Sequence, residues 1–225
     1  MPQSVVTPLI YEINTWVWLE SLSRKYNSSI DLSNVPPSEW DYISEFGFNT
    51  VWLMGVWTRS AAGKAIAGSI PELISEYKAA LPDFVPADVV GSPYSIRDYV
   101  VDPHLGGRDG LAATRIALQA RGLGLILDFV PNHVAPDHAW IQTHPELFVH
   151  GSTAEASAHP DWFFESGGHI LAHGRDPYFP PWTDTAQLNA FNPGLREAAI
   201  QTLLDIASQC DGVRCDMAML LLTDI

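Results

Sequence analysis

The chain has 225 residues, of which 47% are hydrophobic, enough for one large domain with a sizeable core. Its net charge is −14, with 12 Lys and Arg against 26 Asp and Glu. Nucleic acids and anionic membranes are bound through clustered cations, so this balance argues against both as partners. The sequence contains no stretch of membrane-spanning length, and its N-terminus has no recognisable secretory signal, so we expect a cytoplasmic protein. Cys210 and Cys215 form no disulfide framework, and we expect two buried free thiols.

Four segments have the composition of buried strands, and helical patterns lie between them. The strands are expected at residues 9–18, 48–54, 123–130 and 212–216. Helices are expected at residues 36–47 and 108–121, and from the Asn192-Pro193 pair onward. The second helix has Ala113, Ile116, Ala117 and Ala120 on one face. This alternation of strand and helix predicts βα units around a parallel sheet.

Two connections are unusually long, at residues 55–107 and 131–192. Both leave the C-terminal ends of expected strands, where barrel enzymes build their sites, and loops of this length are usually functional. The remaining residues suffice for roughly four βα units at about 30 residues each. A closed eight-stranded barrel needs about 250 residues. The sequence therefore predicts half a barrel or a small open sheet.

The third expected strand ends in polar residues that are unusual for a buried strand. Asp128 shares a face with Ile126, and Asn132 and His133 follow shortly after. A carboxylate on an apolar strand is costly unless it is paired or faces a site. One interpretation places Asp128 in the mouth of a barrel. The other is structural, because Asp and Asn are also common in turns.

The fourth expected strand contains Arg214 and Asp216, which share a face because strand side chains alternate. The guanidinium is expected to depress the pKa of the Asp216 carboxyl and keep it ionised. An ionised carboxylate in an enclosed site is what a glycosidase nucleophile requires. A buried Arg–Asp pair with a purely structural role is the alternative.

These motifs carry a resemblance to a known family. Asp128-Phe-Val-Pro-Asn132-His133 resembles the first signature region of the α-amylase superfamily, glycoside hydrolase family 13, and Gly212-Val-Arg214-Cys-Asp216 resembles the second. Further similar segments occur in the family's order at residues 47–53, 91–107 and 182–189. The resemblance implies an α/β fold, the N-terminal half of a TIM-type (β/α)8 barrel. Residues 1–225 would form one partial catalytic barrel domain, with 131–192 inserted as a loop subdomain.

The resemblance also implies roles for five residues. Asp216 would be the nucleophile that forms a covalent glycosyl intermediate, and Arg214 would orient it and keep it charged. His133 would bond the hydroxyls of the sugar, and Asp128 would support that pocket. Tyr94 would stack on the same sugar, although packing of its own loop is the alternative.

Other loop residues carry weaker expectations. Five loop aromatics are candidates for further sugar subsites, with loop packing as the more common role: Trp57, Trp140, Trp162, Tyr178 and Trp182. Asn132 matches a residue that binds calcium in many family members, while other members keep this Asn without the metal. A calcium site at Asn132 is therefore an open expectation, and no other cofactor is expected. Five histidines without metal spacing are expected at the surface or in loops: His104, His138, His144, His169 and His173.

The sequence departs from the family in two respects. In the family a Glu that ends the fifth strand is the general acid, and a His-Asp pair follows the seventh; neither motif occurs among these residues. The resemblance thus implies a fragment that lacks its general acid/base and needs the C-terminal half of the barrel. The family's Lys/His pair just beyond the nucleophile is replaced by Met219 and Leu220, so the substrate of the acceptor side stays open.

Together these features predict a retaining, α-amylase-like glycoside hydrolase acting on an oligo- or disaccharide with an α-glucosidic linkage. A transglycosylase or a trehalose-synthase-like isomerase of the same family is the first alternative. A non-catalytic sugar-binding half-barrel is the second. An unrelated metal-dependent barrel enzyme, using Asp128, His133 and Asp216, is the third.

Overall fold

The computed structural model describes residues 7–221, which divide into two compact units. The first unit holds the residues up to 58, 99–129 and 201–215. The second holds residues 59–98, 130–200 and those from 216 on. Within residues 7–221, every helix is too short or too polar to cross a membrane.

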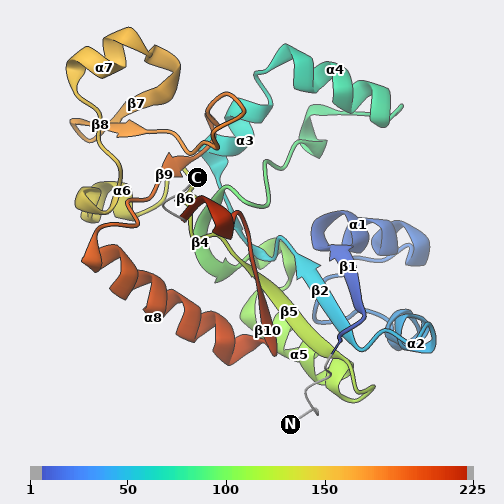
Figure 1. Ribbon diagram of the computed structural model, residues 1–225. Helices are drawn as coiled ribbons and strands as arrows, with labels where there is room; N and C mark the ends of the chain where they lie inside the picture. The colour runs from blue at the N-terminus through green and yellow to red at the C-terminus, as the bar shows by residue number, and fades with distance from the viewer. Residues whose placement is uncertain (1–6, 222–225) are drawn as a thin grey trace. The chain divides into compact units, whose positions relative to one another are not determined.

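The first unit is built on a parallel sheet of four strands (Figure 1). Its strands follow the order β1 (Ile10–Asn14), β2 (Thr50–Met54), β5 (Gly124–Phe129) and β10 (Gly212–Cys215). All neighbours are parallel, and the register sets Trp52 beside Ile126 and Arg214 beside Asp128. The four strands lie within the segments that the sequence predicts, and the expectation of a parallel α/β sheet is confirmed.

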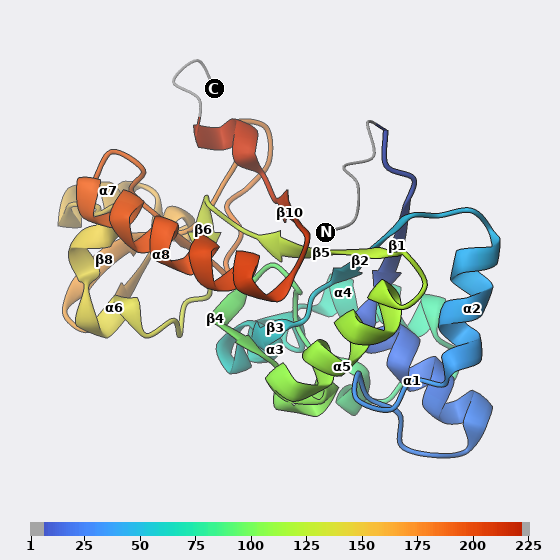
Figure 2. The ribbon, with the colours of Figure 1, turned by 90° about the horizontal axis from the view of Figure 1, so that it is seen from below.

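Helices connect these strands, as βα units require. They are α1 (Thr15–Tyr26), α2 (Pro37–Glu45), α5 (Gly107–Gln119) and α8 (Pro193–Gln209). Figure 2 shows α1, α2 and α5 on the same side of the strands. Pro37 stands in the first turn of α2, and the Oδ1 of Asn192 accepts a hydrogen bond from Gly194 N (2.8 Å) at the start of α8. Both helix starts follow the capping rules that located them in the sequence.

The first strand is shorter than the sequence predicts. It ends at Asn14, and Trp16 and Trp18 belong to α1. Trp and Val favour strands locally, but Leu19 and Leu22 recur at helical spacing and are buried. Trp18 packs against Trp40 of α2, with ring centroids 4.9 Å apart. Packing against α2 therefore overrides local strand propensity after Asn14.

The buried face of α5 is not the face noted in the sequence, and the expectation of two buried thiols is wrong for one of them. The core-facing side of α5 carries Leu111, Thr114 and Leu118, whereas Ile116 is 68% exposed. The Thr114 hydroxyl donates to the backbone oxygen of Leu32 (2.6 Å), which satisfies a polar group on the buried face. Both cysteines are free, but only Cys210 is buried, because Cys215 is exposed where β10 ends.

The second unit contains short elements. Its helices are α3 (Ala61–Ala67), α4 (Pro71–Ala80), α6 (Trp140–Thr143) and α7 (Thr153–Ala158), with 3-10 turns at Pro86–Asp88, Pro145–Leu147, Pro160–Trp162 and Ala218–Leu221. Its antiparallel pairs are β6 (His133–Val134) with β9 (Ala186–Gln187), and β7 (Phe163–Ser166) with β8 (His169–Ala172). A further pair, β3 (Trp57–Arg59) with β4 (Ile96–Val101), runs across the division between the units.

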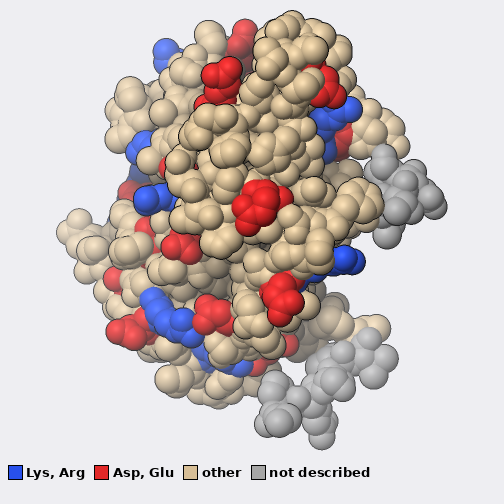
Figure 3. Space-filling model, turned by 90° about the vertical axis from the view of Figure 1, so that its left-hand side faces the viewer, with Lys and Arg blue, Asp and Glu red and all other residues tan. Residues whose placement is uncertain are grey.

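The second unit has its own hydrophobic core. Buried side chains from β6, α6, β8 and β9 pack together, among them Val134, Ile141 and Leu171. In α7, Ser152 and Glu155 form a capping box that satisfies the first turn. On the face shown in Figure 3, acidic and basic side chains lie scattered among uncharged residues.

Candidate active site

Asp128 is a buried carboxylate at the end of β5 whose oxygens are satisfied within the first unit. The residue is 0% exposed. Its Oδ1 accepts from the indole Nε1 of Trp52 (3.0 Å), and its Oδ2 accepts from the backbone N of Gly55 (2.8 Å). Gly55 has φ +76°, a conformation that glycine adopts without strain. Trp57 Nε1 donates to the Asp128 backbone oxygen (2.8 Å). These bonds offset the cost of burying the carboxylate and tie the end of β2 to β5.

Arg214 lies beside Asp128 on the same sheet. The two residues are register partners on β10 and β5. The guanidinium carbon of Arg214 stands 5.0 Å from the centroid of the Trp52 ring, in a cation–π arrangement. Trp52 thus contacts both Asp128 and Arg214. The structure brings these two predicted site residues together at the C-terminal end of the sheet.

The other three predicted residues line one cavity in the second unit, which we call the Asp216 cavity. It has a volume of about 280 Å³, and Tyr94, His133 and Asp216 all line it. Asp216 directly follows β10 in the chain and is 6% exposed. The remaining lining residues are Ser92, Trp182, Asp184, Thr185 and Met217.

His133 is a buried imidazole that stays neutral at physiological pH. Burial lowers the pKa of His133 to about 4, and a hydrogen bond with the Tyr94 backbone opposes that shift only in part. Its ring packs edge-on against Trp182, with centroids 5.2 Å apart. A neutral imidazole fixed in this way can hydrogen bond a sugar hydroxyl without carrying a charge.

Asp184 lines the Asp216 cavity and is not among the site residues expected from the sequence. Burial raises the pKa of the Asp184 carboxyl, and a hydrogen bond from its own backbone N–H opposes this shift in part. Its backbone oxygen accepts from the Ser95 hydroxyl (2.6 Å). The signal for it in the sequence is the Trp182-Thr-Asp184 segment, where a carboxyl follows an aromatic residue within a functional loop.

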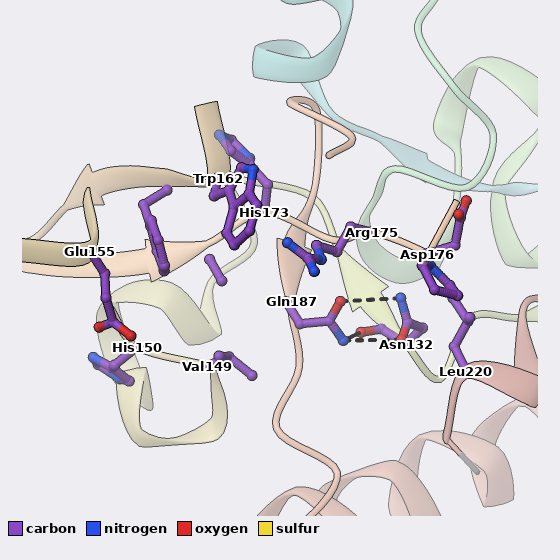
Figure 4. Close-up of a pocket in the computed structure, with 13 residues that line it drawn as sticks. Asn132, Val149, His150, Glu155, Trp162, His173, Arg175, Asp176, Gln187 and Leu220 are labelled. Atoms are coloured by element: carbon purple, nitrogen blue, oxygen red, sulfur yellow. Dashed lines mark hydrogen bonds between the residues drawn. The ribbon is translucent and has the colours of Figure 1, made fainter. Parts of the chain in front are cut away.

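Asn132 lies in a different cavity of the second unit, of about 420 Å³ (Figure 4). Its Oδ1 accepts from Gln187 Nε2 (3.0 Å), and its Nδ2 donates to Gln187 Oε1 (3.3 Å). Gln187 Nε2 also donates to the Asn132 backbone oxygen (2.8 Å). Leu220, at the position where the family's pair is missing, lines the same cavity.

The donor set around Asn132 does not fit calcium, which needs several free oxygens. The Asn132 oxygen is occupied by an amide donor, and the Arg175 guanidinium lines the same cavity. Two carboxylates of this cavity already accept hydrogen bonds from nearby backbone N–H groups. Glu155 accepts from Ser152 N at the start of α7, and Asp176 accepts from Tyr178 N (2.6 Å). Among residues 7–221, no three His, Cys, Asp or Glu side chains gather closely enough to hold a metal ion.

Of the five loop aromatics, Trp182 lines the Asp216 cavity. Trp57 is buried, and Trp140 packs against the core of the second unit. The Trp162 ring stacks on His159, with ring centroids 4.1 Å apart, and the guanidinium carbon of Arg175 stands 4.2 Å from its centroid; Trp162 lines the cavity that contains Asn132. Tyr178 is 84% exposed.

Two of the loop histidines are not at the surface. His138 and His173 lie in loops, as expected, but both are buried. Burial lowers the pKa of His138 to about 4, although the charges of Asp98 and Asp137 oppose the shift. Burial also lowers the pKa of His173.

Comparison with known proteins identifies the family. The chain matches the model "Alpha amylase, catalytic domain" over residues 31–192. The chain belongs to the alpha-amylase family. Its resemblance to glycoside hydrolase family 13, expected from the signature motifs, is confirmed. The four parallel strands match the TIM barrels of this family over part of their length.

Individual relatives of this alpha-amylase family chain differ in function. An alpha-amylase from Lactobacillus plantarum superimposes with a TM-score of 0.63 at 22% identity, over 96% of this chain and 40% of that one. The human amino acid transporter heavy chain SLC3A1 is 30% identical over 103 residues, 45% of this chain and 11% of its own length. A putative maltooligosyl trehalose synthase of Mycobacterium tuberculosis is 52% identical over 42 residues, 18% of this chain and 6% of its own length. The chain thus spans well under half of each of these proteins.

Proposed function

We propose that this chain supplies the nucleophile and part of the sugar-binding pocket of an enzyme that acts on α-glucosidic bonds with retention of configuration. One observation carries the proposal: Tyr94, His133 and Asp216 line the same cavity. These residues come from distant parts of the chain, and the family motifs assign each of them to the sugar at the cleavage point.

The proposed reaction has two displacements. In the first, a carboxylate oxygen of Asp216 bonds to the anomeric carbon, and the bond from that carbon to the glycosidic oxygen breaks. A general acid protonates the leaving oxygen. By resemblance to the family, we expect this acid to be a Glu that follows a fifth strand. In the second step, the same group, now deprotonated, takes the proton from a hydroxyl. The oxygen of that hydroxyl bonds to the anomeric carbon as the bond from this carbon to Asp216 breaks, which restores the free carboxylate.

The other residues have supporting roles in this proposal. His133, being neutral, donates a hydrogen bond to a sugar hydroxyl, and Tyr94 stacks on the apolar face of the ring. Arg214 orients Asp216 and keeps it ionised, while Asp128 fixes the ends of β2 and β5 through Trp52 and Gly55.

The attacking hydroxyl decides between hydrolysis and transfer. Water gives an α-amylase-like hydrolase, which we propose as the principal activity. A sugar hydroxyl gives a transglycosylase or an isomerase through the same intermediate. The local 52% identity to a putative maltooligosyl trehalose synthase favours this second candidate.

Covalent trapping tests the proposal. In the full-length protein, a fluorinated α-glucosyl donor with an activated leaving group should label Asp216. Fluorine slows both displacements, but the activated leaving group keeps the first one fast, so the covalent intermediate accumulates. Asp216→Asn should lower turnover by about 10⁴-fold or more with an unchanged circular dichroism spectrum. Asp161→Asn, at an exposed position, is the matched control and should keep full activity. Labelling of another carboxylate would contradict the assignment, and binding without labelling would favour a non-catalytic sugar-binding protein.

A further inference from the structure

The second unit contains another cavity, beside α4, which we call the α4 groove. It has a volume of about 380 Å³, within the usual range of small-molecule sites. Its walls come from α3, α4 and the segment that follows α4. The lining residues are Ala67, Leu73, Tyr77, Ala80, Leu81, Phe84, Asp88, Val89, Val90, Gly91, Ser92 and Asp184.

The apolar wall of the groove follows from the sequence of α4. Leu73 and Tyr77 lie four residues apart and so share one side of α4, and Leu81 follows directly after the helix ends at Ala80. Together they form an apolar stripe. Such a stripe normally packs into a core, but α4 has no fully buried residue. The stripe instead lies half-buried along the groove, where the ring of Phe84 sits 6.0 Å from that of Tyr77. Half-exposed apolar side chains that line one cavity are typical of a ligand site.

The charges of the groove restrict its ligand. Its polar side chains are those of Asp88, Ser92 and Asp184, and its lining residues include no Lys or Arg. Two carboxyl groups without a cation disfavour an anionic ligand. An uncharged ligand with an apolar or aromatic body matches the walls.

The groove adjoins the Asp216 cavity. Ser92 and Asp184 line both cavities. A molecule that placed a sugar against Tyr94 and His133 would therefore pass Ser92 and Asp184 on its way into the α4 groove. The position of the groove thus suits a group attached to that sugar rather than an independent ligand.

We infer that the α4 groove binds the uncharged, apolar or aromatic aglycone of an α-glucoside whose glucosyl unit occupies the Asp216 cavity. The inference rests on the proposed function for the placement of the sugar. It adds a substrate class: α-glucosides of phenols or of longer alcohols bind better than those of small alcohols. Tyr77 and Leu81 determine this preference.

Calorimetric titration of two ligands tests the inference in the full-length protein, on an Asp216→Asn background that prevents turnover. Phenyl α-glucoside should bind about tenfold more tightly than methyl α-glucoside, because the phenyl ring buries additional apolar surface. Tyr77→Ala should abolish most of this ratio, and Tyr77→Phe should keep it. Tyr42→Ala on α2, outside the groove, is the matched control and should also keep the ratio. If Tyr77→Ala fails to fold by circular dichroism, Leu73→Ala replaces it.

The outcomes distinguish a failure of the groove inference from a failure of the proposed function. If methyl α-glucoside binds and the phenyl compound has no advantage, the sugar site stands and the groove inference is wrong. An advantage that persists unchanged in Tyr77→Ala also overturns it, and would mean that another surface holds the ring. If neither glucoside binds, the proposed function itself fails, and the inference fails with it.

Discussion

Three imidazoles, those of His133, His138 and His173, are buried and have lowered pKa values, so we expect mild acid to destabilise the folded protein. Burial lowers the pKa of His133 from 6.5 to about 4, whereas the unfolded chain keeps the ordinary value. Between these two pH values the unfolded state binds the proton and the folded state does not. The contribution of neutral His133 to the free energy of unfolding is therefore fully present above about pH 6.5 and is lost as the pH falls toward 4.

We predict that this loss can be assigned to single histidines. When the pH is lowered from 7 to 5, the free energy of unfolding should fall by on the order of 2 kcal/mol because of His133 alone. Urea titrations at the two pH values should show a smaller decrease for His133→Gln than for the unchanged protein. His144→Gln, at an exposed position, should leave the decrease as it is. Equal decreases in all three proteins would show that His133 is not held neutral by burial.

Asp128 illustrates what sequence can say about a single residue. Its place at a strand end predicts either a site residue or a structural acceptor, and the sequence does not decide between them. The structure shows the structural part directly, because Trp52 and Gly55 occupy both carboxylate oxygens. These partners lie more than seventy positions away in the chain, so no local pattern indicates them. The same bonds place Trp52 under Arg214, so a structural role and a supporting role at the site are compatible.

At the scale of elements, a pair of side-chain amides links β6 and β9. Asn132 precedes β6, and Gln187 ends β9. Their side chains exchange two hydrogen bonds, and Gln187 also satisfies the Asn132 backbone oxygen. His133, which lines the Asp216 cavity, pairs with Gln187 in the β6–β9 register. The amide pair therefore holds His133 in place without requiring a cation.

We predict that thermal unfolding of the protein does not depend on calcium. Addition of EGTA or of millimolar calcium should leave Tm unchanged, because the Asn132 oxygen is already occupied. Gln187→Ala should lower the free energy of unfolding by about 1–3 kcal/mol, since it removes the amide that donates to the side-chain oxygen of Asn132. Gln142→Ala, which removes an exposed hydrogen bond to Ser166, is the control and should change it much less. A Tm that falls by several degrees in EGTA would show that calcium binds after all.

The elements differ in how well the sequence predicts them. β2, β5 and β10 are found because each is an apolar run, which at β5 and β10 ends at a polar motif. α8 is found because Asn192 and Pro193 mark its start. The end of β1 is missed because Trp16 and Trp18 favour a strand locally, and only packing on Trp40 and other distant residues makes them helical. The α4 groove is missed for a related reason. The apolar stripe of α4 is visible in the sequence, but its partial exposure depends on what the fold places beside it.

The same limit applies to the candidate site. The motifs predict Tyr94, His133 and Asp216, and the structure gathers them around one cavity. Asp184 is not predicted as a site residue, because its position between the two cavities depends on loops far apart in the chain. Asn132 is expected as a calcium ligand through its side-chain oxygen, but in the structure that oxygen accepts a hydrogen bond from Gln187. The sequence therefore predicts which residues belong to a site more readily than it predicts which of them are in contact.

At the scale of the whole molecule, the sheet of the first unit determines how the 225-residue chain should behave by itself. In the described part of the chain, β1 and β10 each pair on one side only. Edge strands offer backbone groups for pairing with another chain, and parallel sheets are normally covered on both faces. Ile10, on the edge strand β1, is 44% exposed. These features favour association of the isolated chain.

We predict that the isolated chain forms dimers or larger soluble species at a concentration of tens of micromolar. The net charge of −14 opposes this, but at about 0.15 M salt charges are screened beyond roughly 8 Å, so light scattering should show more association as salt rises. Ile10→Lys places a charge on the edge of the sheet and should shift the chain toward monomer. Val17→Lys, at an exposed position of α1, adds the same charge away from the edge and should have little effect. A monomer at every salt concentration, with a sharp unfolding transition, would show that the edges of this sheet are protected; equal effects of the two lysines would show that association runs through another surface.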